Sequence, residues 1–203
     1  MKALSILILT IPGREHFLHD LVTRVIEPQL TDEVEVLIDD RVGVSIGERR
    51  NFLLNKCDGN YCAFIDDDDL VSPNYIRKHL ELIKKFEHQI DGIGFTGIIT
   101  MDGKNPQKFV HKAGEEWRET RAGANVTYYR PLNHLNVVKT YIRRSMPFKP
   151  INHGEDYAQA LEMNPAINPD HCVDITDEVM YFYNVRTGIS TTTKRAEEIG
   201  VKL

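Results

Sequence analysis

Residues 61–70 read YCAFIDDDDL, and this stretch decides what kind of fold the chain can have. Its apolar first half has the composition and length of a buried β-strand, and the strand ends abruptly in four aspartates. Open α/β sheets bind ligands at the carboxyl ends of their strands, which is where these acids would lie. Alternate side chains of an extended segment point the same way, so we expect Asp66 and Asp68 to converge. Carboxylate oxygens suit Mg2+ or Mn2+, and Mg2+ usually shares its ligand shell with substrate phosphates.

A solvated acidic turn is the alternative interpretation of such a run. The residues that follow favour a ligand site, because Ser72 and Pro73 are typical of a helix start and apolar residues then repeat at helical spacing. A calcium-binding EF-hand loop counted from Asp66 would have Val71 where that loop requires glycine. That class of site therefore fits poorly.

Length and charge narrow the class of protein. The chain has 203 residues, enough for one α/β domain with a substantial core and little room for a second. Its hydrophobic content of 41% and charged content of 27% are ordinary for a soluble globular protein. A net charge of −5 argues against a broadly basic nucleic-acid surface but leaves room for a local basic groove.

The cysteines and the first apolar run bear on location. Cys57, Cys62 and Cys172 are odd in number and lack metal-ligand spacing, so we expect reduced thiols and a cytoplasmic protein. The apolar run at residues 4–11 is too short to span a membrane, and no transmembrane segment is expected elsewhere. The sequence PGRE follows the run in place of a small-residue cleavage site, so the run is interpreted as the first strand.

Three strand–helix units follow one another in the first half of the chain. The expected strands cover residues 4–10, 34–38 and 61–65, and the expected helices cover residues 14–28, 45–56 and 73–87. Ser45 and Glu48 match a capping box at the start of the second helix. Successive units of this kind predict a parallel sheet whose polar strand ends share one edge, where a nucleotide would bind.

The second half of the chain is less regular. We expect a strand at residues 92–101, an irregular segment at 102–135, a helix ending near Met163, and a last strand at 179–185 before a polar tail. Trp117 is interpreted either as a stacking platform for a substrate or as an anchor in a loop or core. Glu155 and Asp156 open the helix, where acids favour the helix dipole.

Six motifs, in this order and spacing, resemble those of glycosyltransferase family 2, whose members have the GT-A fold. They are SILILTIPGR (residues 5–14), VLIDD (36–40), ERRN (48–51), FIDDDDL with SPNY (64–70 and 72–75), GEDY (154–157), and YFYNVR (181–186) with Ser190 beyond it. The resemblance covers nearly the whole chain. It implies a single α/β GT-A (Rossmann-like) domain over residues 1–203, with a mostly parallel central sheet flanked by helices. Residues 1–100 would bind the nucleotide-sugar, and residues 101–203 would form the acceptor and catalytic half.

The reaction that the resemblance implies is metal-dependent, inverting transfer of a sugar from a nucleoside-diphosphate sugar to an acceptor hydroxyl. A UDP-sugar is the commonest donor in the family. Asp68, with Asp66 beside it, would hold Mn2+ or Mg2+, which stabilises the leaving diphosphate. Asp156 would be the base that takes the acceptor proton, with Glu155 as the alternative. The residues expected to bind the nucleotide-sugar are Thr10, Pro12, Arg14, Asp39, Asp40, Arg49, Arg50, Asn51, Asp66 and Asp67.

The acceptor side of the site is expected to involve Trp117, His134 and His153. Arg186 stands where many family members have a histidine, so His153 and His171 become the alternative histidine ligands for a metal. The acceptor itself stays open among a soluble glycan, a protein side chain and a modified nucleobase.

The opening TIPGR resembles that of short family members carried by bacteriophages. The acceptor would then be a hydroxymethylpyrimidine base of DNA in the host cytoplasm. Basic residues of the second half would meet DNA phosphates, and the alternative is a solvated surface of mixed charge. The basic residues concerned are Arg118, Arg121, Arg130, Lys139, Arg143, Arg144 and Lys149.

Other classes of protein share parts of this pattern. A HAD-like phosphatase also places Asp-x-Asp after a hydrophobic strand, but it usually does so on the first strand and with Thr or Val where this chain has Leu70. A nucleotidyltransferase would need a glycine-rich first loop, which is missing. A non-catalytic nucleotide- or sugar-binding module is the remaining alternative.

Overall fold

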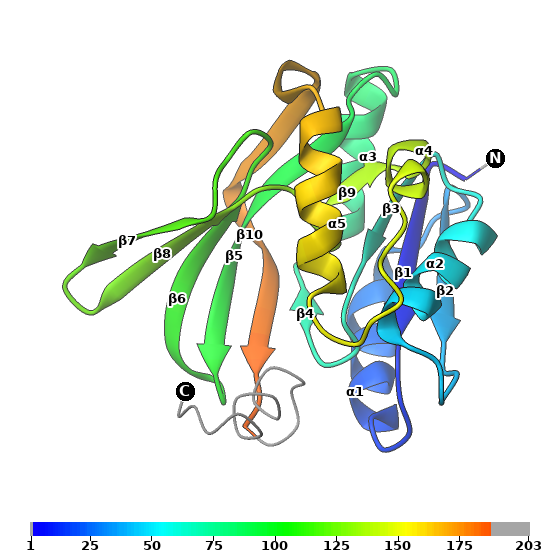
Figure 1. Cartoon of the computed structure of the whole chain (residues 1–203), viewed down its shortest axis with the longest axis horizontal. Helices are drawn as coiled ribbons and strands as arrows, with labels where there is room; N and C mark the ends of the chain where they lie inside the picture. The colour runs from blue at the N-terminus through cyan, green and yellow to red at the C-terminus, as the bar shows by residue number, and fades with distance from the viewer. Residues whose placement is uncertain (1, 188–203) are drawn as a thin grey trace.

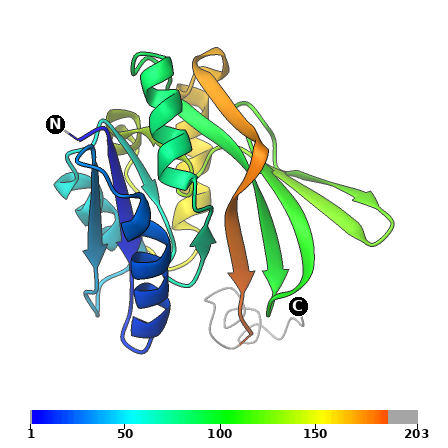
Figure 2. The ribbon, with the colours of Figure 1, turned by 180° about the vertical axis from the view of Figure 1, so that it is seen from behind.

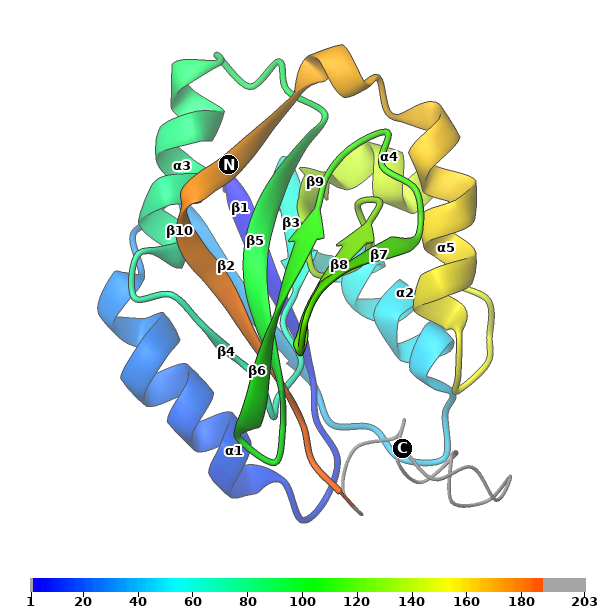
Figure 3. The same ribbon diagram turned by 90° about the vertical axis from the view of Figure 1, so that its left-hand side faces the viewer.

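A computed structural model describes residues 2–187 of the chain. One mixed β-sheet runs through the centre of this part, and helices cover both of its faces (Figure 1, Figure 3). The arrangement confirms the α/β fold predicted from the alternating strand and helix patterns. The predicted tail beyond Thr187, including Ser190, lies outside the described residues.

The described residues form ten strands and five α-helices. The strands are β1 (Leu4–Leu9), β2 (Val34–Asp39), β3 (Tyr61–Phe64), β4 (Leu70–Val71), β5 (Gly92–Met101), β6 (Lys104–His111), β7 (Arg118–Ala122), β8 (Asn125–Arg130), β9 (Val137–Lys139) and β10 (Cys172–Val185). The helices are α1 (Glu15–His19), which continues as a π-helical segment over Asp20–Ile26, α2 (Ile46–Lys56), α3 (Tyr75–Lys85), α4 (Thr140–Ser145) and α5 (Glu155–Met163).

The sheet has a parallel core of β2, β1 and β3 at one edge and is mixed from β9 to the other edge. Its strand order is β2-β1-β3-β9-β5-β6-β8-β7, and β10 pairs with β5 in parallel and with β4 antiparallel. Because β1 pairs in parallel with both β2 and β3, these three strands end at the same edge. The predicted gathering of polar strand ends at one edge is thereby confirmed.

Strand β1 shows why the first apolar run is nearly continuous. Ile6 and Ile8 pack into the larger core cluster with residues of α3, whereas Leu7 packs with Leu53 and Leu54 of α2. Successive side chains of a strand point to opposite faces, so a strand covered on both faces needs apolar residues at every position. Figure 2 shows α1 in blue and α3 in green over the face opposite α5.

The prediction that residues 102–135 are irregular is wrong over most of this segment. Strands β6, β7 and β8 occupy it and extend the sheet as a projecting arm, seen at the left of Figure 1. The turn between β5 and β6 is Asp102-Gly103, with φ of 48° and 72°. Two successive positive φ angles match the tight hairpin turn that Asp-Gly favours.

Two element boundaries also differ from the sequence prediction. Helix α3 begins at Tyr75 rather than Pro73, because the Ser72 N–H donates to the Met180 carbonyl and prolongs the pairing of β4 with β10. Strand β10 begins at Cys172 rather than residue 179 and follows β5 along its whole length. None of the helices among residues 2–187 has the length and apolar character needed to cross a bilayer.

The start of α2 is docked onto the segment that leads to α5. The predicted capping box forms, with Ser45 Oγ accepting the Glu48 N–H at 3.3 Å and the Glu48 carboxylate accepting the Ser45 N–H at 3.1 Å. The Gly47 N–H donates to the Ile151 carbonyl at 3.1 Å. A Cβ atom on Gly47 would lie 1.8 Å from the Lys149 carbonyl oxygen, so only glycine allows this approach.

Replacing Gly47 with alanine should therefore destabilise the fold, despite the higher helix propensity of alanine. We expect a loss of about 1–3 kcal/mol in the free energy of unfolding, as for an overpacked site. Thermal or urea unfolding measures it. Asn55→Ala, at an exposed position of the same helix, is the matched control and should leave stability nearly unchanged. Equal stability of the Gly47 variant and the wild type would contradict the close approach.

Candidate active site

A cavity of about 640 Å³ opens where the ends of β1 and β3 face the start of α5 and the strands of the projecting arm. It brings together residues that are far apart in the sequence. The predicted site residues that line it are Thr10, Arg14, Arg49, Arg50, Asp66, Asp67, Asp68, Trp117, His134, His153, Glu155 and Asp156. Tyr128, His111 and Asn133 also line it, and no sequence motif indicated them as site residues.

Four residues predicted to bind the nucleotide-sugar, and one predicted alternative metal ligand, do not line the cavity. Pro12 and Asp40 are exposed outside it, and His171, the alternative metal ligand, lies beside Asp91 instead. Asn51 uses its side-chain amide to bond Phe148, donating to its carbonyl at 2.8 Å and accepting its N–H at 2.9 Å. These bonds tie α2 to the segment before α5 and take Asn51 out of the candidate site.

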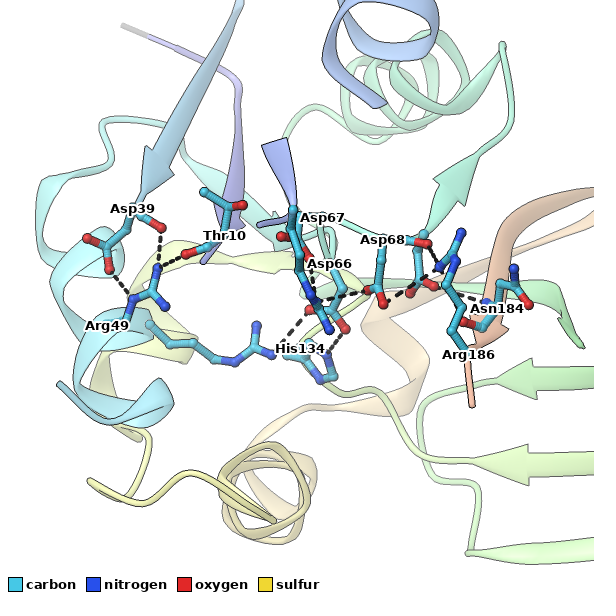
Figure 4. A network of polar contacts seen from close by, with 12 residues as sticks. Thr10, Asp39, Arg49, Asp66, Asp67, Asp68, His134, Asn184 and Arg186 are labelled. Atoms are coloured by element: carbon cyan, nitrogen blue, oxygen red, sulfur yellow. Dashed lines mark hydrogen bonds and ion pairs between the residues drawn. The ribbon is translucent and has the colours of Figure 1, made fainter. Parts of the chain in front are cut away.

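Asp39 is the fourth of the predicted nucleotide-sugar residues that do not line the cavity. It is buried in an ion-pair network at the strand ends. Its carboxylate accepts from Arg49 Nε at 2.8 Å and from Arg41 Nε at 2.7 Å. Arg49 Nη2 also donates to the carbonyls of Thr10 and Asp39, which joins α2 to the ends of β1 and β2 (Figure 4). Burial opposes ionisation of Asp39, but the hydrogen bonds from Arg41 and Arg49 outweigh it and lower the pKa of Asp39.

The four aspartates form a turn rather than an extended segment. The Asp69 N–H donates to the Asp66 carbonyl at 3.1 Å, so the predicted alternation of side chains along a strand is wrong here. Each carboxylate instead has its own set of partners, as Figure 4 shows for Asp66 and Asp68. Asp66 pairs with Arg50 and His134, Asp67 with Arg14, Asp68 with Arg14 and Arg186, and Asp69 with the Tyr181 hydroxyl and the Asn184 N–H.

These surroundings separate the charge states of the acids. Burial raises the pKa of Asp69 well above its usual value, and the charges of Asp66 and Asp68 add to the effect. Burial and the neighbouring carboxylates also raise the pKa of Asp68, against the opposing effect of Arg14. Asp66 is the opposite case, because His134 and Arg50 outweigh its burial and lower its pKa. Asp66 is thus more strongly ionised than Asp68 or Asp69.

The carboxylate oxygens at this turn are suitable ligands for a divalent cation whose coordination a bound phosphate would complete. Within residues 2–187, no three His, Cys, Asp or Glu side chains are grouped so as to enclose a metal ion by themselves. Mg2+ needs only one or two protein carboxylates when substrate phosphates complete its shell. Asp68 and Asp66 both line the cavity and offer oxygen ligands, and a cation beside Asp68 would offset the crowding of negative charge there.

Arg50 connects the acidic turn to the start of α5. Its Nη2 lies 3.3 Å from Asp66 Oδ1, and its Nε lies 3.2 Å from Glu155 Oε1. The guanidinium is buried and its carbon lies 4.8 Å from the centre of the Phe64 ring. Asp66 and Glu155, which are 89 positions apart in the sequence, are thereby held together at one cavity, as the family resemblance implies for the two acidic motifs.

The cavity contains polar atoms that the protein leaves without hydrogen bonds. Thr10 Oγ1, Arg50 Nη1 and Asp67 Oδ2 are buried, line the cavity and have no partner among the described residues. Buried polar groups are usually satisfied, so such a concentration at one place indicates room for a polar ligand. Its hydrogen-bonding groups would complete these contacts.

Aromatic and guanidinium groups line the side of the cavity formed by the arm. Trp117 is 38% exposed, and its ring meets the Tyr157 ring edge-on with centroids 4.9 Å apart. Arg130 lies on β8, and its guanidinium carbon is 4.7 Å from the centre of the Trp117 ring. Of the two interpretations of Trp117, this placement at the cavity favours the platform.

The predicted set of basic residues does not form one surface. Arg143 is fully buried and donates to the carbonyls of Asn133 and Asn136, and Arg144 donates to the carbonyls of Leu54 and Cys57. Both are structural residues, which corrects their assignment to a phosphate-binding face.

The thiols of Cys57 and Cys62 are free and buried, as expected.

Comparison with solved structures places the fold. The crystal structure of S. aureus TarS residues 1–349 in complex with UDP-GlcNAc superimposes with a TM-score of 0.57 and 14% identity over 93% of this chain. A longer S. aureus TarS crystal structure gives 0.56 and 14% over 91%. The chain spans 60% of the first structure and 37% of the second. The fold is therefore of the GT-A class.

The sequence itself carries the family relationship. A family model described as Glycosyl transferase family 2 matches residues 29–151, which is more than half of the chain. The chain belongs to this family of glycosyltransferases, as the motifs predicted. Comparison with curated proteins gave no match.

The Asp39 network leads to a prediction about stability. Because the pKa of Asp39 is lower in the folded state, its ion pairs stabilise the fold above the unfolded pKa of about 4, and this contribution is lost as the pH falls through the folded pKa. Asp39→Asn should cost about 3 kcal/mol near neutral pH, because it leaves the buried Arg49 charge without its carboxylate. Unfolding measured from pH 7 to pH 3 tests this.

The difference between Asp39→Asn and the wild type should shrink on acidification. Asp40→Asn is the control for stability, since Asp40 is exposed. A penalty for Asp39→Asn that stays constant down to pH 3 would contradict the ion-pair explanation.

Proposed function

We propose that the chain transfers a sugar from a nucleoside-diphosphate sugar to an acceptor hydroxyl, with inversion at the anomeric carbon. The observation that carries this proposal is the cavity in which the acidic turn faces Glu155 and Asp156. A transfer of this kind needs a site for the leaving diphosphate and, on the opposite face of the sugar, a base. The acidic turn, through a bound cation, and the acids at the start of α5 line the same cavity and would supply the two.

The donor would bind along the ends of β1 and β3, in the first half of the chain. Arg14, Arg49 and Arg50 line this part of the cavity, and guanidinium groups suit phosphate oxygens. Asp40 is the exposed acid beside the buried Asp39, so it is the better placed of the two to meet a nucleoside. TarS has been crystallised with UDP-GlcNAc and with UDP, which supports a uridine nucleotide as the first donor to test.

Asp68 and Asp66 would hold Mn2+ or Mg2+ at the diphosphate. Such a cation, when bound, supplies Lewis-acid stabilisation of the charge that gathers on the leaving group. The chain's own contribution is to orient the diphosphate, because Arg14 lies 3.5 Å from the Asp68 carboxylate and Arg186 lies 3.6 Å from it. Cationic side chains therefore flank the position where the diphosphate would lie.

Asp156 is better placed than Glu155 to act as the base. The side chain of Glu155 is 6% exposed and is held by Arg50, whereas that of Asp156 is 35% exposed and lines the cavity. An accessible carboxylate can reach the acceptor hydroxyl and accept its proton as the new glycosidic bond forms. Glu155 would hold Arg50, and through it Asp66, in position.

The acceptor would enter on the side of the arm, against Trp117 and Tyr157. A flat aromatic surface bordered by a guanidinium suits a ring, either a sugar or a modified nucleobase. A soluble glycan and a DNA base both meet this requirement. His153, exposed at the cavity beside Asp156, would contact the same acceptor.

Nucleotide binding is the first test. Thermal unfolding with a panel of nucleoside diphosphates and Mn2+ should show a rise in stability with one base, about 2.7 kcal/mol when the ligand is present at 100 times its Kd. Chelator should weaken the effect, and Asp68→Ala should abolish it. Asp32→Ala, an exposed acid at the opposite end of β2, is the control and should retain it.

No shift with any nucleoside diphosphate, from folded protein, would contradict the proposal and favour a phosphatase-like enzyme or a different binding module. A shift without sugar transfer to any glycan or nucleobase acceptor would favour a non-catalytic nucleotide-binding module.

The base assignment makes a separate prediction. Asp156→Asn should lower the rate of sugar transfer about 10²–10⁴-fold, because general base catalysis is worth that much. Nucleoside diphosphate affinity should change little, since Asp156 lies on the acceptor side. Radiolabelled or coupled transfer assays measure the rate. A variant that folds, binds the nucleotide and transfers at the wild-type rate would show that Asp156 is not the base.

A further inference from the structure

The imidazole ring of His134 lies between the two acidic motifs without a hydrogen bond. It belongs to the segment between β8 and β9, whose residues 131–136 are all buried, and its side chain is 8% exposed at the cavity wall. Neither ring nitrogen has a hydrogen-bond partner among the described residues. A buried imidazole that is left unsatisfied costs stability, so its position calls for a functional explanation.

Each nitrogen of His134 faces a different carboxylate. Nε2 lies 3.6 Å from Asp66 Oδ2, and Nδ1 lies 3.5 Å from Asp156 Oδ2. Figure 4 shows the ring against Asp66 at the acidic turn. Both distances are slightly longer than a hydrogen bond, and contacts of this kind often tighten when substrates bind. One side chain therefore touches both the donor-side acid and the proposed base.

The backbone around His134 is fixed by side chains. Asn136 Oδ1 accepts the Asn133 N–H at 3.0 Å, and Asn133 Oδ1 accepts the Leu135 N–H at 3.0 Å. The His134 carbonyl accepts the Phe64 N–H at 2.9 Å, which attaches the segment to β3 directly before the acidic turn. The ring position is thus set by the same strand that positions Asp66.

Arg143 fixes the segment on its other side. Its Nη2 donates to the carbonyls of Asn133 and Asn136 at 3.1 and 2.9 Å, and its Nη1 donates to Gln159 Oε1 at 3.0 Å. Gln159 lies on α5, one turn after Asp156. The buried arginine therefore holds the segment of His134 at a constant distance from the helix that carries the proposed base.

We propose that His134 is a positioning residue, which holds the Asp156 carboxylate toward the acceptor and connects it to the donor site through Asp66. The inference rests on the proposed sugar transfer and on Asp156 as its base. His134 forms no bond to either substrate in this role. Its effect on the reaction passes through the orientation of Asp156, so it should appear in kcat rather than in nucleotide affinity.

This role can be tested with substitutions that retain a hydrogen-bonding nitrogen at only one of the two ring-nitrogen positions of His134. The amide of asparagine can occupy the place of Nδ1, which faces Asp156, and the amide of glutamine can occupy that of Nε2, which faces Asp66. We expect His134→Ala to lower kcat about 10–100-fold, the size typical of partners that orient a site residue. His134→Asn should recover most of the rate, and His134→Gln should recover little of it.

Nucleoside diphosphate affinity should stay within about twofold of the wild type in all three variants, since positioning residues need not alter ground-state binding. In the Asp156→Asn background, adding His134→Ala should lower kcat no further, because the effect passes through Asp156. His79→Asn is the matched control. His79 is a second buried histidine with an unpartnered Nε2, on α3 away from the cavity, and its substitution should leave kcat unchanged.

Wild-type kcat in His134→Ala would overturn the inference. So would equal rescue by asparagine and glutamine, or an additive loss in the double variant. If His134→Ala does not fold, the comparison of the asparagine and glutamine variants decides alone. A wild-type protein that binds nucleotide but transfers no sugar would instead overturn the proposed function, and the inference with it.

Discussion

Four adjacent carboxylates repel one another, and the part of the fold around residues 66–69 is arranged to offset that repulsion. A cation or hydrogen-bond donor approaches each acid from a different part of the chain. Arg14 comes from the loop after β1, Arg50 from α2, and Arg186 from the end of β10. The acidic turn thereby fixes the relative positions of elements that do not follow one another in sequence.

Two neighbouring arginines of α2 join different parts of the molecule. Arg49 bonds the strand ends of β1 and β2, whereas Arg50 spans the cavity from Asp66 to Glu155. Consecutive helix residues point in directions about 100° apart, so one turn of α2 can serve both the sheet edge and the cavity. Buried charges of this kind contribute little net stability, but removing one partner is costly, which makes the geometry strict.

The sequence predicted well those features that local chemistry determines. An unbroken apolar run is enough to predict a buried strand, and Ser45 and Glu48 are enough to predict the capping box, so both features were predicted correctly. Strand β7 was missed because all of its residues are exposed, which removes the apolar alternation by which strands are recognised. Strand β6 was missed although Asp102-Gly103, in the turn before it, was an available hairpin signal. The partners of Asp66 and Asp68, and the position of His134 between two acids, depend on tertiary contacts that no local pattern contains.

The arm formed by β6, β7 and β8 has a consequence for how such proteins diversify. Among residues 2–187, strand β7 pairs only with β8. Its exposed edge carries Arg118, Glu119 and Arg121, charges that discourage pairing with other chains. The arm projects from one side of the sheet, as Figure 1 shows. Residues can therefore be inserted or exchanged there while the parallel core of β1, β2 and β3 stays intact. Trp117 and Arg130, at the root of this arm, would change with it. Under the proposed function, acceptor preference could thus evolve on a separate, tolerant element while donor chemistry is inherited unchanged.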